Sequence, residues 1–419
     1  MNKVVIIGAG FGGISAAKEL QSSGYHVTII DRQNHHLFQP LLYQVATAAL
    51  SPGDIAKPIR SIFKEQRNIN VILGNVVKVD IKEHKVFFND SSLEFDYLIM
   101  APGSAYSYFG KEKWSKFAPG LKTLNDALKI REKIICSLEK AELAEDANER
   151  KKLLTFVIIG GGPTGVELAG AIAEIVNKNI LPDYRNITVN DTKVYLIEAF
   201  SHILNSYPEK LSIIAKQDLE KLGVNIIVNK KVTEINENGV QVENKFIESK
   251  NVIWAAGNHV SSLINDVTTQ IDKSGRAVVN NDLSINEDRH IYIIGDSAFV
   301  KDRDGQSLPA IAPVAIQQGK FVGRLIKSGE SKNIKKGFRY RDKGTIATIG
   351  KAKAVAVVKG LNLSGLFAWL TWCIIHIFYL ISFRNRVRVM GEWIWYYISN
   401  RPGIRLIVKD NPADSVKMN

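Results

Sequence analysis

The chain contains little cysteine. Among its 419 residues only Cys136 and Cys373 occur, far apart and outside any Cys-x-x-Cys pair, which excludes a disulfide framework and a dithiol redox motif. His35 and His36 have no partner at metal-ligand spacing, so we expect no metal site. The N-terminus has only a short apolar run before its first glycine, too short for a secretory signal. We therefore expect a cytoplasmic protein.

Acidic residues are scarce near the C-terminus. Residues 331–409 contain 15 Lys and Arg but only two acidic residues, so they account for the whole net charge of +13. An apolar segment, GLFAWLTWCIIHIFYLISF, lies within this basic stretch at residues 365–383. Because the basic excess accompanies apolar residues rather than a nucleic-acid reading motif, we predict no nucleic-acid partner.

The beginning of the chain reads as a strand, a glycine-rich turn and a helix. An apolar run at residues 4–7 leads into the turn, and a second strand ends in Asp31. In such a unit the glycines permit a tight turn and a close approach of backbone amides to a pyrophosphate, and the acid accepts a ribose hydroxyl. The glycines of the turn are Gly8, Gly10, Gly12 and Gly13.

The same pattern returns in the middle of the chain. LLTFVIIGGGPTGVELAGAIAEI places Gly160, Gly162 and Gly165 at the glycine positions, and a later strand ends in Glu198. Glu198 favours a free ribose 2′-hydroxyl, and no Arg or Lys stands nearby to receive a 2′-phosphate, which predicts NADH rather than NADPH.

A second marker follows each turn at nearly equal distance. Gly103, in an Ala-Pro-Gly turn, lies 95 residues after Gly8, and Gly257, in an Ala-Ala-Gly turn, lies 97 residues after Gly160. The matched offsets favour a structural repeat over turn glycines in unrelated α/β layers. A third marker, Gly295-Asp296 at the end of an apolar run, occurs once.

These markers together resemble the flavoprotein reductases that carry two dinucleotide-binding domains. The resemblance implies an α/β fold with two Rossmann-like domains of the glutathione-reductase type, to which the apolar and basic C-terminal stretch adds an amphipathic helical module. It implies non-covalent FAD in the first domain, where Asp296 would bind the ribityl chain, and NADH as co-substrate in the second. We expect the FAD domain at residues 1–118 and 265–330, the NADH domain at 119–264 and the C-terminal module at 331–419.

Four further stretches resemble the type II NADH dehydrogenases, which are NADH:quinone oxidoreductases that do not pump protons. They are HLFQPLLYQVATAALSP (36–52), TGVELAGA (164–171), APVAIQQG (312–319) and FRYRDKGTIATIGKAKAVA (338–356). The resemblance implies hydride transfer from NADH to FAD and then transfer of two electrons to a membrane quinone in the respiratory chain.

The same resemblance implies catalytic residues. Glu167 matches a glutamate that helps deliver protons, Gln317 matches the last glutamine of an AQxAxQ quinone motif, and Lys343 is a candidate partner of Glu167. Gln318 is a second candidate for the quinone contact. Pro313 stands where that motif often has glutamine, so the contacts to the quinone headgroup stay open. The alternatives are that Glu167 only stabilises a helix N-terminus and that the two glutamines form a polar helix face.

Quinones dissolve in lipid, so we expect the C-terminal module to bind the membrane. We favour a peripheral, monotopic anchor on the cytoplasmic side of the cell membrane, with bases near anionic headgroups. A true span of residues 365–383, a buried helix and a homodimer interface remain alternatives. An aromatic stripe at helical spacing indicates an interfacial helix: Trp369, Trp372, His376, Tyr379 and Phe383.

Two other functions remain open from the sequence. One is an NADH-dependent reductase of a protein acceptor, which would need no membrane anchor. The other is a flavin-bound redox sensor, which NADH would reduce without sustained turnover.

Overall fold

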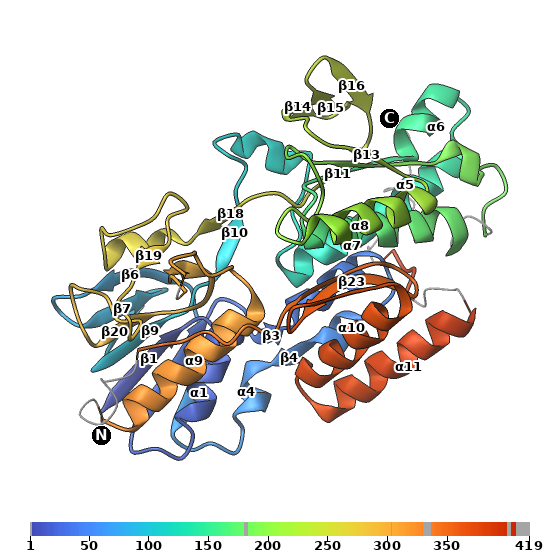
Figure 1. Cartoon of the computed structure of the whole chain (residues 1–419). Helices are drawn as coiled ribbons and strands as arrows, with labels where there is room; N and C mark the ends of the chain where they lie inside the picture. Colours follow the sequence, from blue (N-terminus) through green and yellow to red (C-terminus); the bar gives the residue numbers. More distant parts are fainter. Residues whose placement is uncertain (1, 180–182, 303, 330–336, 400–403, 408–419) are drawn as a thin grey trace. The chain divides into compact units, whose positions relative to one another are not determined.

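The computed structural model describes residues 2–179, 183–302, 304–329, 337–399 and 404–407 (Figure 1). By its internal contacts the chain forms two compact units. Unit 1 comprises Met1–Leu37, Ala56–Ala105 and Asn258–Asp342, and unit 2 comprises Phe38–Ile55, Tyr106–Gly257 and Lys343–Asn419. This division is based on packing, and the three domains expected from the cofactor motifs stay a prediction.

Unit 1 is built on a parallel sheet in the order β20-β9-β1-β2-β5. Its strands carry runs of Val, Ile, Leu and Met that are mostly buried, except in the edge strand β5, whose Leu73 is 56% exposed. The strands are β1 (Lys3–Ile7), β2 (His26–Asp31), β5 (Ile69–Leu73), β9 (Tyr97–Met100) and β20 (Ile291–Ile293).

Two helices of unit 1, α1 (Phe11–Glu19) and α9 (Ala312–Lys327), pack closely on each other. A Cβ atom on Gly319 would lie 2.2 Å from the carbonyl oxygen of Gly12, and one on Gly323 would lie 2.7 Å from that of Ala16. The glycines of α9 therefore allow its backbone to touch that of α1, which fixes the helix that follows the first glycine turn.

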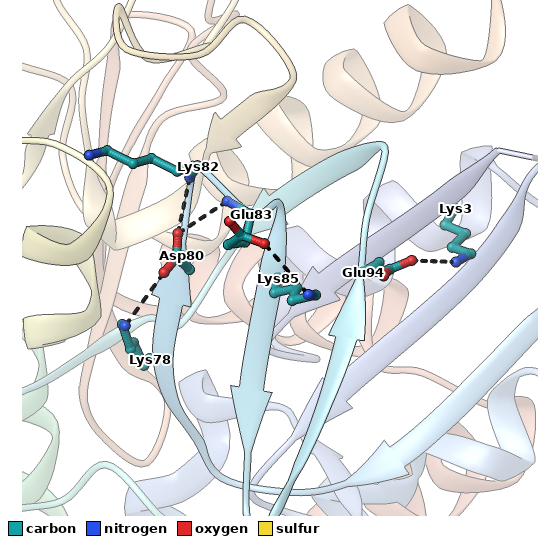
Figure 2. A network of polar contacts seen from close by, with 7 residues as sticks. All are labelled: Lys3, Lys78, Asp80, Lys82, Glu83, Lys85 and Glu94. Carbon is teal, nitrogen blue, oxygen red and sulfur yellow. Dashed lines mark hydrogen bonds and ion pairs between the residues drawn. The ribbon is translucent and has the colours of Figure 1, made fainter.

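An antiparallel sheet of β6 (Val76–Asp80), β7 (Lys85–Phe88) and β8 (Ser91–Glu94) completes the core of unit 1. Figure 2 shows its charged surface, where Lys3 pairs with Glu94 at 3.2 Å and Asp80 accepts the amides of Lys82 and Glu83. Such exposed pairs add little to the free energy of unfolding.

The remaining elements of unit 1 are short. They are β3 (His35–Leu37), β4 (Ala56–Pro58), α4 (Ile59–Ile62), β18 (Asn258–Val260), η6 (Ser262–Asp266), β19 (Ala277–Val278), η7 (Gly295–Ser297) and β21 (Ala298–Phe299). Strand β10 (Ser104–Tyr106) lies where the chain passes from unit 1, which includes Ala105, into unit 2, which includes Tyr106.

Unit 2 repeats the plan of the first with a parallel sheet in the order β13-β12-β11-β17. Its strands are β11 (Thr155–Ile159), β12 (Lys193–Ile197), β13 (Val224–Ile227) and β17 (Asn251–Trp254). Its helices are α5 (Leu124–Leu143), α6 (Ala147–Leu153), α7 (Pro163–Glu174) and α8 (Glu209–Lys221). The unit also contains η2 (Glu112–Lys116), the π turn Ile175–Asn179, η5 (Val189–Asp191) and the antiparallel strands β14 (Val232–Asn236), β15 (Gly239–Val242) and β16 (Lys245–Glu248).

The rest of unit 2 joins an early segment to the C-terminal part of the chain. The early segment holds η1 (Gln39–Leu41), α2 (Leu42–Ala46) and α3 (Pro52–Ile55); the later part holds β22 (Thr345–Gly350), β23 (Lys353–Val358), β24 (Leu361–Ser364), α10 (Gly365–Tyr379) and α11 (Phe383–Ser399). Asn385 donates to the carbonyl oxygens of Gly53 and Asp54, and Arg388 lies 3.4 Å from the buried Asp54 carboxylate. These contacts anchor α11 to the early segment.

The apolar segment 365–383 is divided between two helices. Helix α10 ends at Tyr379, and Ser382 adopts a φ of +85° before α11 begins. Within the described part of the chain, no helix combines the length and the apolar character that a membrane crossing requires.

The expectation that the aromatic stripe faces an interface is wrong for two of its members. Trp372 and His376 are buried, at 2% and 8% exposure, because they stack on each other and Trp372 meets Trp393 of α11. The exposed apolar side chains of α10 are Leu366, Phe367, Leu370, Ile374 and Phe378.

Candidate functional site

The first glycine turn in unit 1 has the backbone geometry that only glycine accommodates well. Gly8 has a φ of +96°, and a Cβ there would lie 2.2 Å from the carbonyl oxygen of Ala101. A Cβ on Gly13 would lie 1.9 Å from the carbonyl oxygen of Gly8. Asp31 closes the turn, since its Oδ2 accepts the Ala9 amide at 2.6 Å and its Oδ1 accepts the Gln33 amide at 2.7 Å.

The second turn, in unit 2, repeats these features. Gly160 has a φ of +111°, and a Cβ on Gly165 would lie 1.8 Å from the carbonyl oxygen of Gly160. Glu198 accepts the Gly161 amide at 2.6 Å with Oε2 and the Phe200 amide at 2.9 Å with Oε1. Glu198 thus occupies the place of Asp31 although a longer loop precedes it in the sequence.

Both turns leave space in front of a helix N-terminus. Gly10 and Gly162 are the N-cap residues of α1 and α7, so neither helix has a capping side chain. A Cβ built on either glycine meets no atom of the described residues within 4 Å. The amides at such a helix start bind a phosphate well, because they lie at the positive end of the helix dipole.

The later glycine markers also adopt matching conformations. Gly103 has a φ of +72° and Gly257 a φ of +68°. Two residues before each glycine, a backbone amide donates to the carbonyl oxygen that ends a strand, at 2.8 Å in both cases: Ala101 to Ile7 of β1, and Ala255 to Ile159 of β11. The expected structural repeat is therefore present in the backbone.

The Gly295-Asp296 turn lies beside the Gly103 turn in unit 1. Ser104 donates to Asp296 Oδ2 at 2.6 Å, and Ser297 donates to the carbonyl oxygen of Gly103 at 3.1 Å. Gly295 has a φ of +72°, and its amide donates to Gln318 Oε1 at 2.6 Å. The structure thus brings together these sequence-predicted residues and adds Ser104 and Ser297, which sequence reasoning missed although each directly neighbours a marker.

The two candidate quinone glutamines have different surroundings. Gln318 is 1% exposed and its side chain supports the Gly295 turn. Gln317 donates to the carbonyl oxygen of Arg341 and accepts the Arg341 amide, both at 3.0 Å. Each glutamine therefore positions a piece of backbone, and their predicted contact with quinone stays a prediction.

Glu167 lies in unit 2 on the face of α7 that packs on β22. Its Oε1 lies 3.5 Å from the Thr348 amide, a long hydrogen bond. Part of the side chain borders open space, yet the surrounding protein excludes most water and raises the pKa of the Glu167 carboxyl to about 8; the Thr348 amide opposes this shift. The Glu167 carboxyl is therefore mostly protonated at neutral pH.

Lys343 has a different partner from the one expected. Its ammonium donates to the Tyr379 hydroxyl at 2.6 Å and lies over the same ring. Among the residues with described positions, no ion pair joins Lys343 to Glu167. The predicted pairing is wrong in this structure, because Lys343 is held by α10 while Glu167 faces β22.

Comparison with known proteins decides the family. A family described as pyridine nucleotide-disulphide oxidoreductase matches residues 2–319, and the NDH2 C-terminal domain matches residues 343–402. The chain is 38% identical to the type II NADH:quinone oxidoreductase Ndh of Mycobacterium tuberculosis, over 98% of this chain and 91% of the relative. This chain belongs to the type II NADH:quinone oxidoreductases. A second mycobacterial member, NdhA, is also 38% identical, over 94% and 86% of the two chains.

Solved structures agree with the fold of a type II NADH:quinone oxidoreductase. NDH2 of Plasmodium falciparum, in complex with NADH, superposes with a TM-score of 0.88 at 23% identity, covering 94% of this chain and 98% of that one. The sulfide:quinone oxidoreductase of Aquifex aeolicus gives a TM-score of 0.73 at 16% identity, covering 95% and 94%. The predicted fold class, with its paired dinucleotide-binding units, is confirmed.

FAD is the standard cofactor of this family, and the first turn fits it. The open space in front of Gly10 can take a pyrophosphate, and two backbone amides already orient the Asp31 carboxylate. A further residue that sequence reasoning missed in this role is His36, which is 2% exposed. Its Nδ1 contacts the Ala9 carbonyl oxygen at 2.9 Å, and among the described residues its Nε2 has no partner. An unpaired buried ring nitrogen beside this turn is consistent with a bound polar group.

Proposed function

We propose that this chain is a membrane-associated flavoenzyme that passes a hydride from NADH to FAD and two electrons from FAD to a membrane quinone, without pumping protons. The observation that carries the proposal is the full-length similarity to type II NADH:quinone oxidoreductases, which includes the C-terminal part. The two separate glycine turns support it, because the reaction needs one dinucleotide held permanently and another exchanged in each turnover.

FAD, when bound, supplies the redox chemistry, and the protein supplies binding, orientation and proton control. In unit 1, the amides at the start of α1 would hold the FAD pyrophosphate, Asp31, which accepts the Ala9 amide, would accept a ribose hydroxyl, and Asp296, fixed by Ser104, would hold the ribityl chain. The cradle that these groups form includes Gly8, Gly10, Gly12, Gly13, Gly103 and Gly295.

The NADH site of unit 2 has the same construction. The amides at the start of α7 would hold the pyrophosphate of NADH, and Glu198 would accept the hydroxyls of its adenosine ribose. Because the carboxylate repels a 2′-phosphate, Glu198 selects NADH over NADPH. The glycines that permit this approach are Gly160, Gly162, Gly165 and Gly257.

Reduction of the quinone needs protons as well as electrons. We assign Glu167 as the proton donor, because a carboxyl group whose pKa is about 8 holds its proton at neutral pH and can release it to a developing quinol oxygen. Gln317 and Gln318 are proposed to border the quinone headgroup, with Lys343 stabilising its negative charge as it forms.

NADH oxidation by the purified yellow protein, with and without a soluble quinone, tests the function. We expect anaerobic NADH to bleach the flavin, added quinone to restore it, and turnover to depend on quinone. If quinone cannot reverse the bleaching of the flavin, the chain is not a quinone reductase. The two remaining functions are then a reductase of a protein acceptor and a redox sensor.

Gln317→Ala is expected to slow quinone reduction about tenfold, which corresponds to the loss of one hydrogen bond that is stronger in the transition state. The first step, anaerobic flavin reduction by NADH, should keep its rate. Stopped-flow absorbance separates the two steps. Gln217→Ala on the exposed side of α8 is the matched control. Equal slowing of both steps by Gln317→Ala would contradict a role at the quinone.

We further propose that α10 and α11 lie on the cytoplasmic surface of the cell membrane. Exposed apolar side chains on α10, among them Phe367 at 77% and Ile374 at 71%, have no cover within the described chain. The exposed Arg384 of α11 suits anionic headgroups. A homodimer formed through the same module is the alternative use of this face.

The double variant Phe367→Asp and Ile374→Asp is expected to weaken binding to anionic vesicles at least tenfold, because it puts two charges into the apolar face. Sedimentation with vesicles measures this, while turnover with a soluble quinone should be unchanged. Ile213→Asp, which changes an exposed isoleucine of α8, is the control. Unchanged sedimentation together with a fall from dimer to monomer would assign the face to a homodimer instead.

A further inference from the structure

Helix α7 carries a second carboxylate on the same face as Glu167. Glu174 lies seven residues later, about 10 Å along the helix. Midway between the two acids, a Cβ on Gly170 would lie 1.8 Å from the carbonyl oxygen of Ile349 in β22, so helix and strand touch there. Glu174 Oε1 accepts the Lys351 amide at 2.6 Å, just after the end of β22. The two carboxylates therefore lie along strand β22, one on each side of the point where α7 and β22 touch.

Both carboxylates line one cavity of about 70 Å³ within unit 2. Because a buried water needs roughly 10–15 Å³, the cavity has room for several. Polar groups on its walls include Tyr43, Gln44, Thr348 and Trp372. The cavity suits water, which needs polar partners of this kind.

The polar groups of the cavity form a connected wall. The Tyr43 hydroxyl lies 3.1 Å from Thr348 Oγ1 and accepts from Gln44 Nε2 at 2.9 Å, and Trp393 Nε1 donates to Gln44 Oε1 at 2.8 Å. Trp372 is 2% exposed, and its Nε1 has no partner among the described residues. A buried indole N–H without an acceptor is costly, so this donor indicates a water within the cavity.

The two acids meet different surroundings. The charge of Glu167 acts on the phenols of Tyr43 and Tyr207, and burial raises the pKa of both, which keeps them neutral. Near Glu174 lie Tyr43 and two groups from the surface side: Tyr396, whose hydroxyl is 3.4 Å from Glu174 Oε2, and Lys351.

The Glu174 end of the cavity borders exposed chain. Lys351 Nζ donates to the carbonyl oxygen of Tyr397, a bond at the protein surface, and lies over the exposed Tyr397 ring. The residues beside Glu174 therefore bring this end of the cavity to the protein surface.

We propose that this cavity is a water-filled proton passage in which Glu174 takes up protons from solvent and Glu167 receives them. The inference rests on the proposed function. In the reaction NADH + H⁺ + quinone → NAD⁺ + quinol, the hydride carries both electrons and one proton, so one proton per turnover comes from solvent. Glu167 gives a proton to the quinol oxygen, and the passage reprotonates Glu167.

Glu174→Gln tests the passage, since it keeps the acceptor for the Lys351 amide but cannot relay a proton as a carboxylate does. Reoxidation of the reduced flavin by a soluble quinone, followed by stopped flow over several turnovers, should slow about tenfold at pH 8.5, a typical size for loss of a proton-transfer group. At pH 6, where protons are abundant, the loss should be less than twofold. Flavin reduction by NADH should be unchanged, and Glu174→Asp should restore most of the rate.

Ala171→Leu tests the cavity itself, because it fills the space and leaves both carboxylates in place. The same slowing at pH 8.5 is expected. Glu220→Gln, on the exposed side of α8, is the matched control. Wild-type rates in either test variant, or a loss of equal size at pH 6 and pH 8.5, would overturn the passage. If quinone cannot reoxidise the reduced flavin of the wild-type protein, the proposed function itself is refuted. The two failures are therefore distinguishable.

Discussion

Replacing Glu167 with glutamine is expected to lower the rate of quinone reduction about 100-fold at pH 7, the usual scale for removing a general acid. The amide keeps the size of the side chain and an oxygen for the Thr348 amide, but it has no acidic proton to donate. Because hydride transfer from NADH precedes this step, anaerobic flavin bleaching should proceed at the wild-type rate. Stopped-flow absorbance at the flavin band measures both steps in one preparation.

The pH dependence of this effect has a defined direction. Burial raises the pKa of Glu167 from 4.5 to about 8, so wild-type quinone reduction should fall as pH rises through about 8, while Glu167→Gln should show a low rate with no such fall. Wild-type activity that persists unchanged to pH 9.5 would contradict the assignment, and so would a Gln variant with normal turnover.

The same group makes the free energy of unfolding depend on pH. A raised folded-state pKa means that the native protein binds the proton more tightly than the unfolded chain, so the contribution of Glu167 is fully present below pH 4.5 and is lost as pH rises to about 8. Thermal unfolding of wild type should therefore show a steeper loss of Tm over this interval than Glu167→Gln does.

Replacing Glu198 with arginine is expected to change the preferred nicotinamide cofactor. The efficiency kcat/KM with NADH should fall about 100-fold and that with NADPH should rise about tenfold, because one ionic or charge-assisted contact at a ribose changes the free energy of binding by roughly 1.5–3 kcal/mol. Initial rates with each cofactor, at saturating soluble quinone, measure the change.

Glu198→Gln separates charge from hydrogen bonding in this prediction. The glutamine oxygen can still accept the Gly161 amide, which the carboxylate accepts at 2.6 Å, so the turn should stay intact. We expect this variant to tolerate NADPH better than wild type without preferring it. An arginine variant that retains the wild-type preference for NADH would remove Glu198 from the cofactor site.

The glycine turns were predictable from the sequence because their geometry is local. Gly8 and Gly160 must adopt positive φ values where a strand turns into a helix, and Gly13 and Gly165 must let that helix pass the same turn. These requirements involve residues five positions apart, so a short motif expresses them, whereas the close approach of Gly8 to Ala101 joins distant parts of the chain. The strand that ends in Glu198 could be recognised despite its longer loop, since the parallel pairing of β11 with β12 restores the acid to the turn.

The surroundings of the side chains outside those turns were less predictable. Gln317 and Gln318 are neighbours in the sequence, but successive residues on a helix point about 100° apart, so they contact Arg341 and Gly295 respectively. The stripe of Trp372 and His376 was assigned to an interface because its spacing marks one helix face. Spacing does not say what covers that face, and here α11 does.

The sequence by itself determined the paired dinucleotide turns, their acids, the family and the basic, apolar character of the C-terminal part, because local conformation and composition carry these features. Only the tertiary structure decided the state of Glu167 and the existence of the cavity beside it. A pKa depends on the solvent and dipoles around a group, and those around Glu167 come from Tyr43, Tyr207 and Thr348, which are remote from it and from one another along the chain. Their approach to a single helix face depends on packing, which no local pattern encodes.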